Sequence, residues 1–205
     1  ITSALAMWFA GVRRRAMRSN LDLFFMGAAF LLLETKSIVQ FSLWFGTTWA
    51  VNAMVFAGIL LSVLGAIEVV RRFRIPKPLH LYGLLVLSVA ATWAIPANAL
   101  LELAAGPRLV VAIVLTFSPI FLANLVFAQR FKETSHSAEA FGVNLLGAMV
   151  GGILEYSALA VGYRSLAILV AVLYGIAYLV WARDSAATSS ISESSSPRVE
   201  VGAPV

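Results

Sequence analysis

Cysteine is absent from this chain of 205 residues, and charged side chains are scarce. Without cysteine there can be no disulfide, no thiolate metal site and no cysteine nucleophile. The two histidines, His80 and His136, have no metal-ligand spacing with nearby acidic residues, so we expect no metal and no cofactor. Only 12% of the residues are charged, whereas a soluble domain has about 25%. The chain therefore lacks the polar groups that cover a water-facing surface.

Enzyme motifs are also missing. The sequence contains no glycine-rich dinucleotide fingerprint, no phosphate-binding P-loop, no nucleophile elbow and no H-E-x-x-H zinc motif. We therefore expect no catalytic residue in this chain. The net charge of +5 does not indicate a nucleic-acid partner, because the basic residues gather where membrane orientation would place them.

Long apolar runs dominate what is present. The chain is 60% hydrophobic and has a mean hydropathy of +0.90. A helix needs about 20 apolar residues to cross a bilayer, and six runs come close to or exceed this length. These runs must be helical, because lipid offers the backbone no hydrogen-bond partner, and they lack the alternation of barrel strands. We predict an all-α polytopic transmembrane bundle with six full spans, at about 21–45, 50–70, 79–96, 109–128, 140–160 and 165–182.

Lysine and arginine are divided unevenly between the two sides of this predicted bundle. The segments on one side carry eleven of them, whereas those on the other carry only Arg108 and Arg164. Basic residues are enriched in cytoplasmic loops. We therefore expect both ends of the bundle to be cytoplasmic.

The two ends of the chain differ from its middle. Residues 1–18 join a short apolar run to an arginine cluster, and we interpret them as the end of a truncated helix and a basic cytoplasmic loop. A signal peptide would carry its charges before the apolar run instead. Residues 19–183 form the expected six-helix domain. Residues 184–205 are rich in serine and poor in large apolar groups, so we expect a disordered cytoplasmic tail.

Two charged residues, Glu34 and Lys36, interrupt the first predicted span. A charge at the bilayer centre costs about 2.5–3.5 kcal/mol on insertion scales, so each needs a partner or water. They lie about 200° apart around a helix and cannot pair with each other. Glu155 in the fifth span lies at a depth similar to that of Lys36, which suggests a Lys36–Glu155 ion pair. The other candidate polar residues inside the membrane are Gln40, Asn124 and Asn144.

Small residues recur four positions apart in the fifth predicted span, and this spacing lets another helix approach closely. They are Gly147, Ala148, Gly151 and Gly152. The stripe also holds Asn144 and Glu155, so it is either a packing surface or the wall of a water-filled path, and we favour packing. In the fourth span Pro119 removes one backbone hydrogen bond, which predicts a kink.

A family resemblance rests on two stretches, GAAFLLLETKSIVQFSLWFGTTWAVNAMVFAGILL and FGVNLLGAMVGGILEYSALAVGYRSL. They resemble bacterial polytopic proteins in which helices similar to half of a major-facilitator transporter are fused to a spermidine-synthase-like domain. The chain is similar to the C-terminal membrane block of that group, over about residues 19–182. The resemblance implies a bacterial inner membrane. It also implies that any aminopropyltransferase activity would lie in a soluble domain that is missing from this chain.

Three functions remain open. The first is an integral membrane scaffold or accessory domain, with the lipid bilayer and either other membrane subunits or a missing N-terminal part of the same polypeptide as partners. The second is half of a major-facilitator-like transporter, in which Glu34, Lys36 and Glu155 line a path for a small solute, with cations among the candidate solutes. The third is the membrane anchor of a spermidine-synthase-like enzyme. Paired, dry charges would favour the scaffold, and a water-accessible cavity at Glu34 would favour transport.

Overall fold

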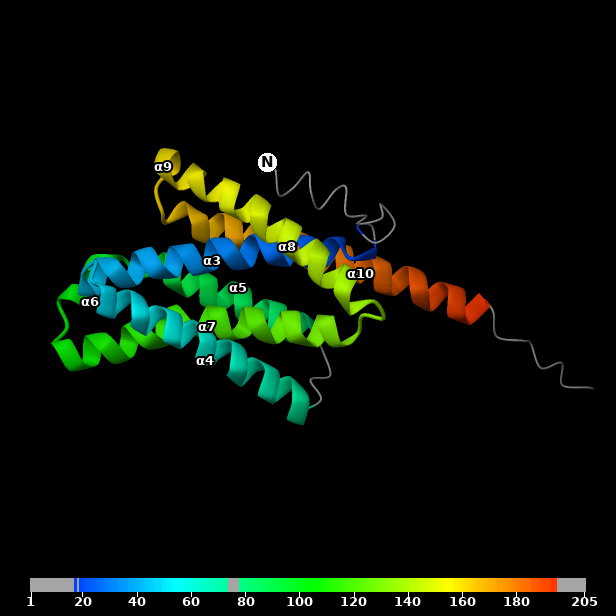
Figure 1. Cartoon of the computed structure of the whole chain (residues 1–205), viewed down its shortest axis with the longest axis horizontal. Helices are drawn as coiled ribbons and strands as arrows, with labels where there is room; N and C mark the ends of the chain where they lie inside the picture. The colour runs from blue at the N-terminus through cyan, green and yellow to red at the C-terminus, as the bar shows by residue number, and fades with distance from the viewer. Residues whose placement is uncertain (1–16, 18, 74–77, 195–205) are drawn as a thin grey trace, which may run out of the picture.

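The computed structural model describes residues 17, 19–73 and 78–194, and every regular element in this part of the chain is a helix (Figure 1). The predicted all-α class is confirmed. The helices are α3 (Leu21–Phe45), α4 (Trp49–Arg72), α5 (Pro78–Ala94), α6 (Ala97–Leu101), α7 (Ala105–Lys132), α8 (Ser137–Leu154), a 3₁₀ turn η1 (Glu155–Ser157), α9 (Ala158–Val161) and α10 (Ser165–Ser194).

Within the described residues, four helical segments are long and apolar enough to cross a membrane. They are α4, α7, the continuous segment Ser137–Ala160 that begins with α8, and Ser165–Ala186 of α10. The apolar part of α5 is shorter, over Leu79–Ala94, and α3 carries three charged residues. Four such helices are compatible with a multi-pass membrane protein, and six full spans stay a prediction.

Helix α3 occupies the middle of the bundle. It packs most extensively against α8 and α10, and it also contacts α4, α6 and α7 (Figure 1). About half of its 25 residues are buried, among them Leu23, Leu32, Leu33 and Phe41. In lipid, helices associate through close packing and polar contacts rather than through exclusion of water. The side chains on the surface of α3 therefore determine how the neighbouring helices pack against it.

The turn between α3 and α4 follows from its residues. Gly46 ends α3 with φ 91°, a conformation that glycine adopts without a steric penalty, and its N–H donates to the Ser42 carbonyl at 2.8 Å. Thr48 then caps α4, and its Oγ1 accepts from the Val51 N–H at 3.3 Å. Gly162, with φ 81°, ends α9 in a similar way. Both turns lie in the gaps between predicted spans.

Two segments differ from expectation. Residues 97–108 separate the third and fourth predicted spans, but they hold the short helix α6, and α7 begins at Ala105 rather than near residue 109. Residues 184–194 were expected to be disordered, but α10 continues through them to Ser194, which Ala186 and Ala187 favour because alanine has the highest helix propensity. The rest of the expected tail, 195–205, lies outside the described residues. So does the expected truncated helix and basic loop, apart from Met17.

The helices alternate in direction, so the polar residues gather at two ends of the bundle. Helices α4, α7 and α10 all end on the side where α3 begins (Figure 1). That end carries Arg71, Arg72, Arg130 and Lys132. At the opposite end, Arg108 lies over the ring of Phe45, and Arg164 donates to the Trp93 carbonyl at 2.7 Å.

Candidate functional site

Lys36 lies in a buried polar cluster between α3 and α5. Its Nζ donates to Oε1 of Gln40, one turn further along α3, at 2.5 Å and to Oγ1 of Thr92 on α5 at 3.1 Å. The Thr92 hydroxyl donates in turn to the Val89 carbonyl at 2.8 Å. Lys36, Gln40 and Thr92 are 2%, 4% and 5% exposed. The ammonium group is therefore shielded and bonded to two oxygens, and the cluster ties α3 to α5.

The predicted ion pair between Lys36 and Glu155 is wrong. Oε2 of Glu155 accepts instead from Oγ1 of Thr35, at 3.2 Å. Thr35 and Lys36 are adjacent, so their side chains leave α3 about 100° apart. Thr35 reaches the segment that follows α8, whereas Lys36 reaches α5. Lys36 and Glu155 were predicted to lie at similar depth, but they do not pair, because the Lys36 side chain leaves α3 on a different side from the one that faces Glu155.

Glu34 is the exception among the polar groups of α3. It is half-buried, and within the described part of the chain no hydrogen-bond or ion-pair partner contacts it. The buried Tyr174 of α10 is near enough to interact with it electrostatically. Glu34 thus faces a different neighbour from Lys36, as their angular separation predicts.

The remaining candidate polar residues do not join these contacts. The Nδ2 of Asn124 donates to the Ile120 carbonyl at 2.9 Å, within α7 itself. Asn144 contributes its backbone carbonyl to the contact between α8 and α3. Among the described residues, no group of three His, Asp or Glu side chains could hold a metal ion. The structure therefore brings Lys36 and Gln40 together and leaves Glu34, Asn124, Asn144 and Glu155 at separate places.

The small residues of α8 lie directly against the backbone of α3. A Cβ added at Gly147 would lie 1.9 Å from the Phe24 carbonyl oxygen, and one at Gly151 would lie 2.6 Å from that of Ala28. Gly27 of α3 shows the reverse relation, since its Cβ would lie 2.1 Å from the Asn144 carbonyl oxygen. Only glycine permits backbones to approach so closely. Gly152 is less tightly placed, with its nearest neighbour the tip of Leu31, and Ala148 is half-buried.

Pro119 lies buried in the interior of α7, which remains helical from Ala105 to Lys132. A proline leaves the carbonyl four residues earlier without its usual donor. The nearby Ser118 hydroxyl donates to the Val114 carbonyl at 2.5 Å, one residue before that position. Among the described atoms, Oγ1 of Thr116 is buried without a hydrogen-bond partner. The kink at Pro119 stays a prediction.

A buried ion pair that the sequence did not indicate joins the first and fourth long helices. Nε of Arg130 on α7 donates to Oδ2 of Asp22 on α3 at 2.5 Å. The Asp22 side chain is 1% exposed and that of Arg130 is 17% exposed. The two residues are separated by 108 positions, so spacing cannot reveal the pair. The one feature of the sequence that favours this pair is that Asp22 and Arg130 lie near the same predicted end of the bundle.

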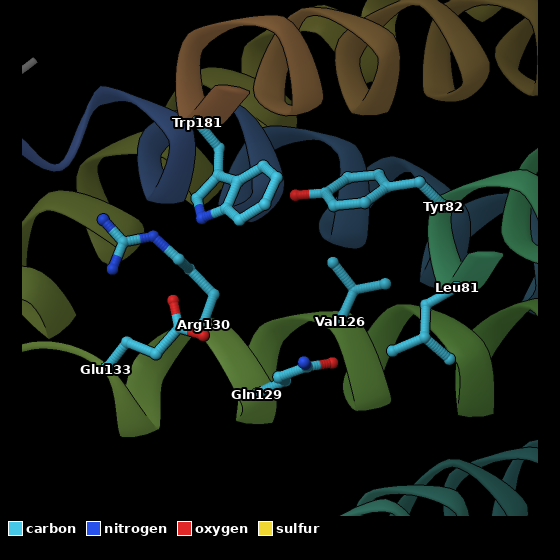
Figure 2. Close-up of a pocket in the computed structure, with 7 residues that line it drawn as sticks. All are labelled: Leu81, Tyr82, Val126, Gln129, Arg130, Glu133 and Trp181. Carbon is cyan, nitrogen blue, oxygen red and sulfur yellow. The ribbon is translucent and has the colours of Figure 1, made fainter. Parts of the chain in front are cut away.

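A small cavity adjoins this ion pair (Figure 2). Arg130 of α7 and Glu133, the residue after α7, line it together with Tyr82 of α5 and Trp181 of α10. The Tyr82 hydroxyl points into the cavity, is buried, and has no hydrogen-bond partner among the described atoms. The cavity measures about 10 Å³, which is room for about one water molecule. It is too small for an organic substrate.

Comparison with known proteins identifies no relative of this chain. No family model, no curated protein and no solved structure matches the chain. The functional argument therefore depends on the contacts described above. The resemblance to the fused major-facilitator-like and spermidine-synthase-like proteins stays a prediction from the two sequence stretches.

Proposed function

We propose that this chain is an integral membrane scaffold or accessory domain of a larger protein or complex, without catalytic chemistry of its own. The observation that carries this proposal is the state of Lys36, which is 2% exposed and bonded to Gln40 and Thr92. A residue that lines a transport path needs access to water or solute. Lys36 instead holds two helices together, and the Asp22–Arg130 pair does the same for α3 and α7.

The proposed arrangement has six spans in a bacterial inner membrane, with both ends of the bundle in the cytoplasm. The clustering of Arg71, Arg72, Arg130 and Lys132 at one end supports this orientation, because basic residues favour the cytoplasmic side. The chain contains no cysteine, so single-cysteine variants carry no labelling background. Thr47→Cys at one end and Ser135→Cys at the other are both exposed positions. An impermeant thiol reagent applied outside intact cells should label only Thr47→Cys.

Partners distinguish a scaffold from a protein that acts alone. We expect the particle extracted from its native membrane with a mild detergent to contain more protein mass than a single 22.0 kDa chain. The additional mass would be other subunits or further sequence of the same polypeptide, including the soluble domain that the anchor alternative requires. A single 22.0 kDa chain without any partner would contradict the proposal.

Half of a transporter is the second candidate, and Glu34 favours it. This carboxyl group is half-buried and has no hydrogen-bond partner within the described residues. Intramembrane acidic groups without a structural partner often mark ion or proton pathways. If Glu34→Gln abolished solute uptake into reconstituted vesicles while the protein stayed folded, transport would replace scaffolding as the better proposal.

A further inference from the structure

Two grooves lie end to end along the seam between α4 and α7. The first lies between residues 54–62 of α4 and 113–121 of α7. The second, of about 560 Å³, lies between residues 63–71 and 124–132, with Phe141 of α8 at its edge. The C-terminal half of α4 diverges from the rest of the bundle (Figure 1). The second groove, which we call the inner groove, therefore opens towards the end of the bundle that is rich in basic residues.

The inner groove has apolar walls and a charged mouth. Ile67 of α4 and Phe127 and Phe131 of α7 are among its wall residues, while Arg71 and Lys132 line it where the two helices end. Its volume is within the 300–1,000 Å³ that small-molecule sites occupy. The groove thus matches the two parts of an amphiphilic ligand. Its apolar walls follow α4 and α7, and its cations lie where these helices end.

The charge at the mouth of the inner groove is positive overall. Glu68 accepts hydrogen bonds from Nε and Nη2 of Arg71, at 2.8 Å and 2.7 Å, and also pairs with Arg72. One carboxylate therefore serves two guanidinium groups. Lys132 is exposed, and within the described part of the chain it has no acidic partner. The residues that line the groove include two cations, Arg71 and Lys132, and no carboxylate, so the mouth attracts a negative group.

We propose that the inner groove binds an anionic phospholipid of the cytoplasmic leaflet, with an acyl chain between α4 and α7 and the phosphate near Lys132 and Arg71. Basic pockets between transmembrane helices on the cytoplasmic side select acidic headgroups. Charge-assisted hydrogen bonds from lysine and arginine to phosphate supply the selectivity. The proposal requires that α4 and α7 cross the membrane with their basic ends in the cytoplasm, the orientation proposed above, and it applies equally to a scaffold and to a transporter.

Native mass spectrometry of the full chain tests this proposal. The protein is equilibrated with equal amounts of phosphatidylglycerol and phosphatidylcholine that carry identical acyl chains, and the bound lipids are counted. We expect phosphatidylglycerol to be retained preferentially. Lys132→Gln should lower this preference by about fivefold, the effect of one basic residue near an anionic headgroup. Ile67→Trp, which places a bulky ring at the groove wall, should lower retention of both lipids.

Two matched variants make the result specific to the groove. Arg183→Gln removes an exposed cation near the same end of the bundle, and Leu64→Trp enlarges an exposed residue of α4 outside the groove lining. Both should bind lipid as the unmodified chain does. The proposal is overturned if Arg183→Gln and Lys132→Gln reduce the preference equally, or if the two lipids bind equally well. It is also overturned if a second copy of the chain covers the groove and excludes lipid.

Discussion

Lys36 of α3 and Thr92 of α5 are joined by a hydrogen bond of 3.1 Å in the interior of the bundle, where each is at most 5% exposed. This contact explains how a lysine is tolerated within an apolar helix. The ammonium group is buried away from lipid. It donates one hydrogen bond to Oγ1 of Thr92 on α5 and another to Oε1 of Gln40 on α3. A buried charge of this kind fixes the position of its neighbours, because separating them would leave it without partners.

Removing one oxygen from the Lys36 cluster should destabilise the protein more than removing the charge. Gln40→Leu leaves the ammonium buried with one partner fewer, and we expect a loss of about 1.5–3 kcal/mol in the free energy of unfolding, the contribution of a hydrogen bond to a charged group. Lys36→Met removes the charge while keeping much of the side-chain length, so its cost should be smaller. Equilibrium unfolding in detergent micelles checks this order. A larger cost for Lys36→Met would show that the ammonium group itself is the principal stabilising element.

The ion pair between Asp22 and Arg130 should behave as a unit. Asp22→Leu or Arg130→Met alone leaves a charge at a buried position, so each should lower the free energy of unfolding by about 3–5 kcal/mol. Asp22→Leu combined with Arg130→Met should recover most of that loss, since no buried charge remains. A double-mutant cycle based on thermal unfolding measures the coupling. Additive losses would mean that the two residues stabilise the bundle independently.

The glycines of α8 permit a matched comparison within a single helix. An alanine at Gly147 would place its Cβ 1.9 Å from a backbone oxygen of α3, whereas one at Gly142 would meet nothing within 4 Å. Gly147→Ala should therefore destabilise the protein by about 1–3 kcal/mol or more, as overpacking does. Gly142→Ala should be neutral or stabilising by up to about 1 kcal/mol, because alanine favours helix. Equal effects would contradict the close approach of α8 to α3.

The bond between Thr35 and Glu155 predicts a modest effect. Polar contacts between transmembrane helices contribute about 0.6 kcal/mol on average and rarely more than about 1.7 kcal/mol. Thr35→Val should therefore cost about 1 kcal/mol, and Glu155→Gln, which keeps an oxygen acceptor, should cost less. Unfolding by denaturant in micelles can resolve these two variants. A loss of several kcal/mol for Glu155→Gln would indicate an ionic partner beyond Thr35.

The helices were more predictable than their contacts. The expected span 21–45 coincides with α3 because polar residues bound the apolar run at both ends. The stripe at Gly147 and Gly151 also indicated a close packing surface, since small residues four positions apart let a second helix approach closely. The partners of Lys36 and Arg130 were not predictable, because they depend on which helix occupies each side of α3. The helical course of residues 184–194 was not predicted, because a serine-rich segment with few large apolar groups is also typical of a disordered tail.

The water accessibility of Thr92 tests the central claim most directly. A single Thr92→Cys variant can be exposed to a membrane-impermeant thiol reagent from each side of reconstituted vesicles, with Thr47→Cys and Ser135→Cys as exposed references. If the Lys36 cluster is a dry tie between α3 and α5, Thr92→Cys should remain unlabelled from both sides while the references react. Labelling of Thr92→Cys at a rate near that of the references would show a water-filled path at Lys36, and would contradict the scaffold account.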